Sequence, residues 1–145
     1  MPTVLDILAT KGDHVHTIAA SATVLEATQL MNDQKIGALV VMDGRKVAGM
    51  FTERDVLRRV IAEERSPRQV RVGDVMTREI VCCGPDTDLD DASAIMRDRR
   101  IRHLPICDDD GQLHGLISIG DLNAFHASHQ EAHISFLSEY VYGRV

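Results

Sequence analysis

The chain repeats itself, and this internal repeat constrains the fold more than any other feature of the sequence. With a shift of 65 residues, apolar residues of the first half fall on apolar residues of the second half. The matched pairs are Val24 with Leu89, Ala27 with Ala92, Leu30 with Ile95, Met31 with Met96, Ile36 with Ile101, Leu39 with Leu104 and Val41 with Ile106. The shift becomes 66 after a one-residue insertion in "CDDDGQ", and it is 68 near the N-terminus. This pattern indicates two copies of one supersecondary unit.

Each copy has the order strand, helix, strand, strand, helix. In the first copy, a short helical turn near Leu5–Leu8 precedes a strand around Val15–Ile18. Apolar residues at helical spacing predict a helix over Thr23–Asp33, with Thr23 and Glu26 as its capping box. The β-rich runs "ALVVM" and "KVAGMF" are separated by "DGR" and predict a hairpin. The following "TERDVLRRVIAEE" predicts a second amphipathic helix.

The two copies predict an α/β (α+β) fold in which two β-α-β-β-α repeats pack as a pseudo-twofold pair. A unit of this size leaves one face of its sheet uncovered, and pairing buries that face. We expect the first repeat over residues 1–65, the second over 66–125 and a helical tail over 126–145, with "ERSPRQ" as the linker. A Rossmann unit is excluded, because the chain has no glycine fingerprint and a tight turn joins the paired strands.

Composition excludes several classes of function. A net charge of −6 argues against a nucleic-acid binder that acts through bulk charge. No apolar run approaches the ~20 residues of a membrane span, and "MPTVLDILATKGDH" does not resemble a signal peptide, so we expect a cytoplasmic protein without membrane contact. Cys82, Cys83 and Cys107 lack CxxC spacing and fit buried thiols in a reducing compartment.

One motif recurs at the same place in both copies. "GMFTERDV" contains Thr52 and Asp55, and "GLISIGDL" contains Ser118 and Asp121, each pair at the junction of a strand and a helix. A hydroxyl followed by a carboxylate at this spacing is also a capping box, but capping boxes favour the longer Glu or Gln. A short Asp at a helix start can accept hydrogen bonds from a vicinal diol such as ribose, and the hydroxyl and free amides suit a phosphate. The recurrence favours a ligand site.

The second half, with "IRHLPICDDDGQLHGLISIGDL" as its clearest signature, resembles the cystathionine β-synthase (CBS) domain. The tandem resembles a CBS pair, or Bateman module, of the stand-alone bacterial type. The resemblance implies a non-catalytic regulatory module that binds AMP, ADP or ATP in clefts between the repeats, with S-adenosylmethionine or a dinucleotide as other candidates. It implies no required cofactor, no catalytic residue and no metal ligand, and it implies a regulated partner protein.

The resemblance also implies which residues line the clefts. One cleft would combine Ser118 and Asp121 with the segments Val15, His16, Ile36, Gly37 and Ala38. The other would combine Thr52 and Asp55 with Ile80, Ile101, Arg102 and His103. Related modules grip phosphate with basic residues at the last two positions, although without the resemblance an exposed face of an edge strand would be the simpler interpretation. The first-half equivalents, Gly37 and Ala38, are neutral, so the two clefts should differ.

The histidines leave a metal site open as an alternative. His14 and His16 share one face of a strand, and His126, His129 and His133 have helical spacing. The tail shows no carboxylate or cysteine on the same face that would complete a site, and its histidines continue an apolar stripe typical of helix packing. We therefore predict no specific metal.

The tail also bears on assembly and on competing functions. A long C-terminal helix from about Ile119 to Tyr140 would expose an apolar stripe on a monomer, so we expect a homodimer. The alternatives to a nucleotide sensor are a small enzyme, either metal-dependent or built on a Cys–His pair, and a ligand-free assembly scaffold. No nucleophile, base and orienting group are recognisable together.

Overall fold

The computed structural model describes residues 2–12 and 14–128. The first half contains α1 (Val4–Lys11), β1 (Thr17–Ala19), α2 (Val24–Gln34), β2 (Ala38–Asp43), β3 (Lys46–Thr52), α3 (Glu53–Asp55) and η1 (Val56–Ile61). The second contains α4 (Val72–Val75), α5 (Leu89–Arg99), β4 (His103–Cys107) and β5 (Leu113–Ser118). Residues 119–128 form a further helix, which we call the C-terminal helix. Together they confirm the predicted mixed α/β class and element order.

The first half is built on a three-stranded sheet in the order β1-β2-β3. β1 runs parallel to β2, and β2 and β3 form the predicted antiparallel hairpin. The hairpin turn contains Gly44 at φ +63°, a conformation that favours glycine. The helix predicted over Thr23–Asp33 is α2, and the Thr23 hydroxyl accepts a hydrogen bond from the Glu26 amide at 3.1 Å, which confirms Thr23 as its N-cap.

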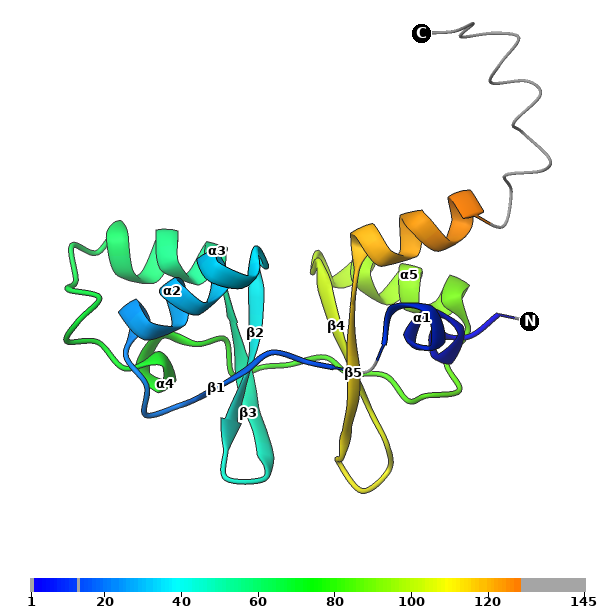
Figure 1. The fold of residues 1–145 in the computed structure, drawn as a ribbon, viewed down its shortest axis with the longest axis horizontal. Helices are drawn as coiled ribbons and strands as arrows, with labels where there is room; N and C mark the ends of the chain where they lie inside the picture. The colour runs from blue at the N-terminus through cyan, green and yellow to red at the C-terminus, as the bar shows by residue number, and fades with distance from the viewer. Residues whose placement is uncertain (1, 13, 129–145) are drawn as a thin grey trace, which may run out of the picture.

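The second half repeats this plan with a smaller sheet. β4 and β5 form an antiparallel hairpin, and the segment equivalent to β1 is reduced to one parallel bridge between Cys83 and Ile106. The two hairpins lie next to each other, with the helices towards one end of the molecule and both hairpin turns towards the other (Figure 1).

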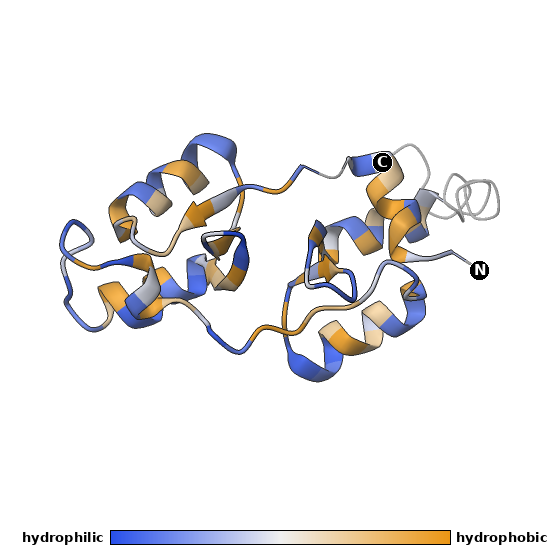
Figure 2. Cartoon of the chain, turned by 90° about the horizontal axis from the view of Figure 1, so that it is seen from below, coloured by the Kyte–Doolittle hydropathy of each residue, from blue (hydrophilic) through white to orange (hydrophobic). Residues whose placement is uncertain are grey.

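The leading helix of each sequence repeat packs on the other half (Figure 1). The apolar side of α1, with Val4, Ile7 and Leu8, joins the core formed by α5, β4, β5 and the C-terminal helix. The apolar residues of α4 join the core of α2, β2 and β3. Two connecting segments therefore cross between the halves, as the view from below shows (Figure 2).

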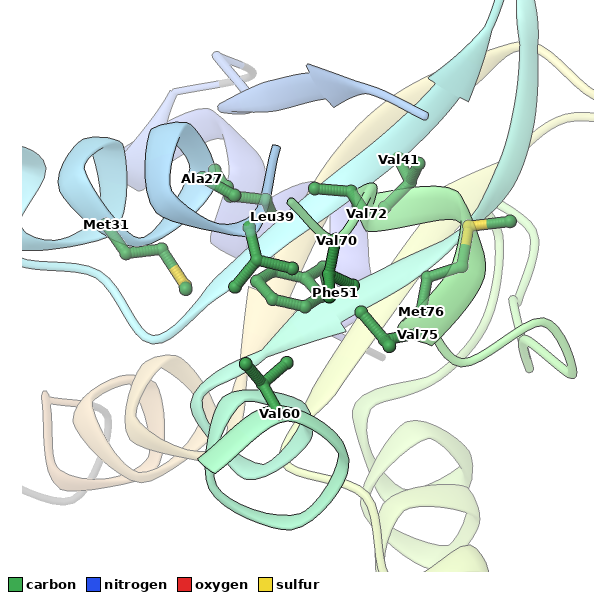
Figure 3. Packing of buried hydrophobic residues seen from close by; sticks show 11 residues of the cluster. Ala27, Met31, Leu39, Val41, Phe51, Val60, Val70, Val72, Val75 and Met76 are labelled. Carbon is green, nitrogen blue, oxygen red and sulfur yellow. The ribbon is translucent and has the colours of Figure 1, made fainter. Parts of the chain in front are cut away.

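The first core is centred on Phe51, which is fully buried. Three side chains surround its ring: Leu39 from β2, Val60 from η1, and Val70 from the segment that precedes α4 (Figure 3). A third cluster joins the halves: Ala38, Val40 and Met50 are buried against partly buried Ile80 and other residues of the second half. The sheet faces thus cover each other, as the pseudo-twofold pairing required.

The helix predicted over "TERDVLRRVIAEE" has an unexpected form. It begins as a single turn, α3, and continues as the π-helix η1, in which the Ala62 amide bonds the Leu57 carbonyl at 2.9 Å. π-Helical segments are rare and occur often near functional sites. Leu57 and Ile61, both on η1, lie on the surface, 63% and 56% exposed.

Candidate functional site

Ser118 and Asp121 lie where β5 passes into the C-terminal helix. The Asp121 Oδ2 atom accepts a hydrogen bond from the Ser118 amide at 2.8 Å, and the Asp121 amide donates to the Ser118 hydroxyl at 3.1 Å. These two bonds are a complete capping box. The short Asp side chain reaches the amide, so its length does not by itself argue for a ligand.

The capping box of α1 supports this correction. Thr3 and Asp6 cap α1 in the same way, with the Thr3 amide donating to Asp6 Oδ2 at 2.8 Å. This pair follows no Gly-apolar-apolar strand end and belongs to no predicted cleft. An Asp at the third helical position therefore serves as an ordinary cap in this chain, and a ligand role for Asp121 depends on what surrounds it.

Asp121 is held by a cation from the other end of the sequence. Lys11, at the end of α1, places Nζ 2.7 Å from Asp121 Oδ2 and 2.6 Å from the Leu116 carbonyl oxygen. Burial raises the pKa of the Asp121 carboxyl, but the hydrogen bonds from Lys11 and the Ser118 amide outweigh it, so the net pKa lies below its ordinary value. Asp121 is therefore an ionised carboxylate at neutral pH, with a quarter of its side chain exposed.

His103 lies near this carboxylate and also near Glu53, which follows Thr52, whereas the resemblance implied that Arg102 and His103 line the cleft of Thr52 and Asp55. His103 is the cross-strand partner of Ser118 in the β4–β5 hairpin, and Arg102 precedes it with an exposed side chain. Burial, then the charges of Lys11 and Arg102, lower the pKa of the His103 ring, against the opposing effects of Asp121 and Glu53. The ring is therefore neutral at pH 7 and lies among charges from both halves.

The Thr52–Asp55 motif has a different environment. Asp55 is buried, with 5% exposed, and its Oδ2 accepts from the Thr52 amide at 3.0 Å. The Thr77 hydroxyl, from the chain after α4, donates to Asp55 Oδ1 at 3.1 Å, and Arg59 Nε lies 3.6 Å from the same oxygen. The guanidinium of Arg59 also donates to the Met76 carbonyl at 3.0 Å. The carboxylate is thus occupied by the chain itself.

The remaining predicted site residues lie in three environments. Val15, Ala38 and Ile80 come together in the cluster between the halves. Ile36 and Ile101 pack against the first and second cores respectively.

Backbone groups hold the other two. The His16 carbonyl accepts from the Val40 amide at 3.2 Å, and the Gly37 carbonyl accepts from the Glu53 amide at 3.1 Å. At Gly37 a β-carbon would lie 3.3 Å from the Glu53 carboxyl group, so the backbone there packs closely on an acidic side chain.

Sequence reasoning missed the three residues that contact the motif aspartates, Lys11, Thr77 and Arg59. Lys11 and Asp121 are 110 positions apart, and no periodicity connects them. Thr77 follows "GDVM", the copy of "LDIL" in the first repeat, but the equivalent residue there is Ala9, so the repeat gave no signal. Arg59 is four residues after Asp55, and that spacing indicated an ion pair along the helix.

The metal alternative gains no support from residues 2–12 and 14–128, where no group of three or more His, Cys, Asp or Glu side chains is arranged to hold an ion. His129 and His133 lie outside the described residues, as do the predicted helix and apolar stripe beyond residue 128. In the same described part of the chain, no helix combines the length and apolarity needed to cross a bilayer.

Two hairpin-and-helix units paired face to face, each with a Gly-apolar-apolar-[Ser/Thr]-x-x-Asp motif at a strand–helix junction, define a tandem repeat module. The family model of the CBS domain matches the chain twice, at residues 4–62 and 72–126, and the chain belongs to the CBS domain family.

Relatives and solved structures agree with this assignment. The CBS domain-containing protein YhcV of Bacillus subtilis is 36% identical over 132 residues, covering 91% of each chain. A structure of a protein with CBS domains from Burkholderia ambifaria is 40% identical, with a TM-score of 0.84 over 89% of this chain and 96% of that one. The CBS domain pair of protein MJ0100, solved with 5'-methylthioadenosine and S-adenosyl-L-methionine, is 21% identical with a TM-score of 0.79 over 89% and 98%.

Proposed function

We propose that the protein is a non-catalytic regulatory module that binds an adenine nucleotide at Asp121 and signals its occupancy to a partner protein. The observation that carries the proposal is the group around that carboxylate. An ionised acceptor suited to ribose hydroxyls lies beside Lys11 and near the neutral donor–acceptor ring of His103, and the charge of Arg102 acts on the same ring. A diol acceptor beside cationic groups matches the chemistry of a nucleoside phosphate.

The two motifs support binding unequally. The Asp121 side chain is 25% exposed, and its ion pair with Lys11 involves a flexible side chain that is itself 36% exposed. Lys11 can turn from the carboxylate to a phosphate without disturbing the core. At Asp55 a ligand would have to displace Thr77 and Arg59 from a buried carboxylate, which costs more free energy. We therefore expect first occupancy at Asp121.

The likeness to the MJ0100 pair supports the adenosyl class of ligand, since that module was solved with two adenosyl compounds. The direct test is native mass spectrometry of freshly purified protein, followed by calorimetry with AMP, ADP, ATP and S-adenosylmethionine. One bound adenosyl ligand per chain at low concentration supports the proposal. Guanosine and inosine monophosphates are the matched controls. If no adenosyl compound binds, the protein is better explained as a ligand-free assembly scaffold. If the bound nucleotide is converted to a product, the protein is better explained as an enzyme.

Replacing Arg102 with alanine should weaken ATP binding by about tenfold and AMP binding by less, because we expect the exposed guanidinium to pair with the additional phosphates of ATP. Calorimetric titration of both nucleotides measures the difference. Arg99→Ala is the control, since it removes an equal charge from an exposed position at the end of α5. Equal losses for AMP and ATP would show that Arg102 does not contact phosphate.

We also propose that two copies associate. Leu57 and Ile61 lie four residues apart on η1 and expose most of their apolar surface, which a second copy would cover. Light scattering of the full chain should report about twice 16.0 kDa, and the double variant L57D/I61D should shift it to a monomer. Leu5→Asp, at an exposed leucine of α1, is the control and should leave the dimer intact. A monomer at micromolar concentration for the unmodified chain would refute the association.

A further inference from the structure

A groove of about 800 Å³ lies at the end of the molecule away from Asp121, between the turns of the two hairpins. Arg45 and Lys46 of the first hairpin line one side, and the acidic turn at 108–110 lines the other. His103 is paired with Ser118 and Cys107 ends the same strand, so the groove is about 13 Å along β4 from the Asp121 site. All three cysteines of the chain line it.

The backbone brings these cysteines together. The Cys83 amide donates to the Pro105 carbonyl at 3.1 Å, and the Cys107 amide donates to the Cys83 carbonyl at 2.9 Å. Because side chains alternate along paired extended segments, Cys82 and Cys107 leave from one face and Cys83 from the other. Cys83 packs against the second core, whereas Cys82 and Cys107 both line the groove, and Cys82 lies near enough to raise the pKa of the Cys107 thiol.

We propose that Cys82 and Cys107 form a dithiol site that small anionic disulfides of the glutathione type oxidise reversibly to an intramolecular disulfide. Cys82 is exposed and is the thiol that a reagent in the groove meets first. Arg45 and Lys46 can pair with the carboxylates of such a reagent, and Asp108, Asp109 and Asp110 on the other side can pair with its ammonium groups.

The reaction balances in two exchange steps. The Cys82 thiolate attacks one sulfur of the small disulfide, forming a mixed disulfide and releasing one small thiolate, which takes up a proton. Cys107 then loses its proton to water and attacks Cys82 Sγ, expelling the second small thiol. Two protein thiols are oxidised, and one small disulfide is reduced to two thiols.

The order of attack agrees with the surroundings of Cys107. Burial, followed by the charge of Cys82, raises the pKa of the Cys107 thiol to about 12, so it is a poor first nucleophile. Once Cys82 is in a mixed disulfide it can no longer ionise, so its contribution to the raised pKa of Cys107 disappears, while the contribution of burial remains. Cys107 then attacks a sulfur that is already its neighbour.

Intact-mass spectrometry tests the proposal on the full chain. Reduced protein is incubated with oxidised glutathione, quenched with iodoacetamide and digested. We expect the mass of the intact chain to fall by about 2 Da on oxidation, measured before alkylation. After alkylation, one thiol should be modified in place of three, and the digest should contain a peptide that links Cys82 to Cys107. Cys83→Ser should still form the link, and Cys107→Ser should keep one glutathione on Cys82. A wild-type chain that retains all three thiols, keeps a stable mixed disulfide, or links through Cys83 overturns the proposal.

A second arm examines the groove. The double variant R45E/K46E should slow oxidation by glutathione disulfide several-fold and leave oxidation by the neutral hydroxyethyl disulfide unchanged, since only the charged reagent is attracted. If the variant is oxidised by glutathione disulfide as fast as the unmodified protein, Arg45 and Lys46 do not belong to the site. The site is independent of nucleotide binding, so neither result depends on Asp121.

Discussion

Replacing Gly49 with alanine should destabilise the protein severely, whereas the same change at Gly115 should be mild. Both glycines open the repeated motif, yet their surroundings differ. A β-carbon at Gly49 would lie 2.5 Å from the carbonyl oxygen of Thr77 and 2.9 Å from the sulfur of Met76. At Gly115 it would lie 2.7 and 2.8 Å from the two terminal methyls of buried Leu8, and the far end of a side chain can shift more readily than backbone.

The Gly49 clash falls on backbone that cannot yield locally. Met50 and Thr77 exchange two hydrogen bonds, of 2.9 and 2.8 Å, which attach the chain after α4 to β3. Moving the Thr77 carbonyl breaks this bridge and shifts the hydroxyl that contacts Asp55. We expect a cost of about 3 kcal/mol and a fall in Tm of roughly 10 °C for Gly49→Ala, against about 1 kcal/mol for Gly115→Ala.

Urea and thermal denaturation followed by circular dichroism measure both variants under the same conditions. Gly111→Ala is not a suitable control, because its φ of +80° adds backbone strain. Equal losses at Gly49 and Gly115 would show that the bridge to Thr77 tolerates displacement, contrary to the packing described above.

Asp121→Asn should lower the affinity for an adenine nucleotide roughly 10- to 100-fold, as expected for the loss of a charge-assisted hydrogen bond. Asparagine retains an oxygen that can accept from the Ser118 amide, so the cap and the fold should survive. Calorimetry gives the affinity, and thermal denaturation in the absence of ligand shows whether the fold is intact.

Asp6→Asn is the matched control, because Asp6 caps α1 with the same geometry and lies in no predicted cleft. It should leave nucleotide affinity unchanged. If Asp121→Asn binds as tightly as the unmodified protein, the Ser118–Asp121 pair is only a helix cap and the proposed ligand site is wrong.

Most of the fold could be predicted from the internal repeat of the sequence. Helix α2, its Thr23 cap and the β2–β3 hairpin depend on contacts between near neighbours, which leave a period and turn residues in the chain. The reduction of the second-half strand equivalent to β1 to the single bridge at Cys83 was not predicted, because the extent of pairing between distant segments leaves no period in the chain. The π-helix could not be predicted either, since the spacing of its apolar residues is also typical of an α-helix.

The candidate site was less accessible to sequence reasoning than the fold. The motif identified Asp55 and Asp121 equally, but the Asp55 side chain is buried and contacts Thr77, whereas the Asp121 side chain is 25% exposed and contacts Lys11. Both contacts arise only when the leading segment of one repeat meets the other half. A pattern along the chain records which residues recur, and it does not record which partners they acquire.

The crossing of α1 has a consequence for how the chain folds during synthesis. Val4, Ile7 and Leu8 leave the ribosome long before Leu104, Ile117 and Leu122, on which they pack. The first three-stranded sheet, by contrast, finds its covering helix α4 soon after β3 is made. The segment 17–76 can therefore fold as a unit while the apolar face of α1 remains uncovered. The second half forms last, because its contacts with α1 close a long loop and loop closure slows folding.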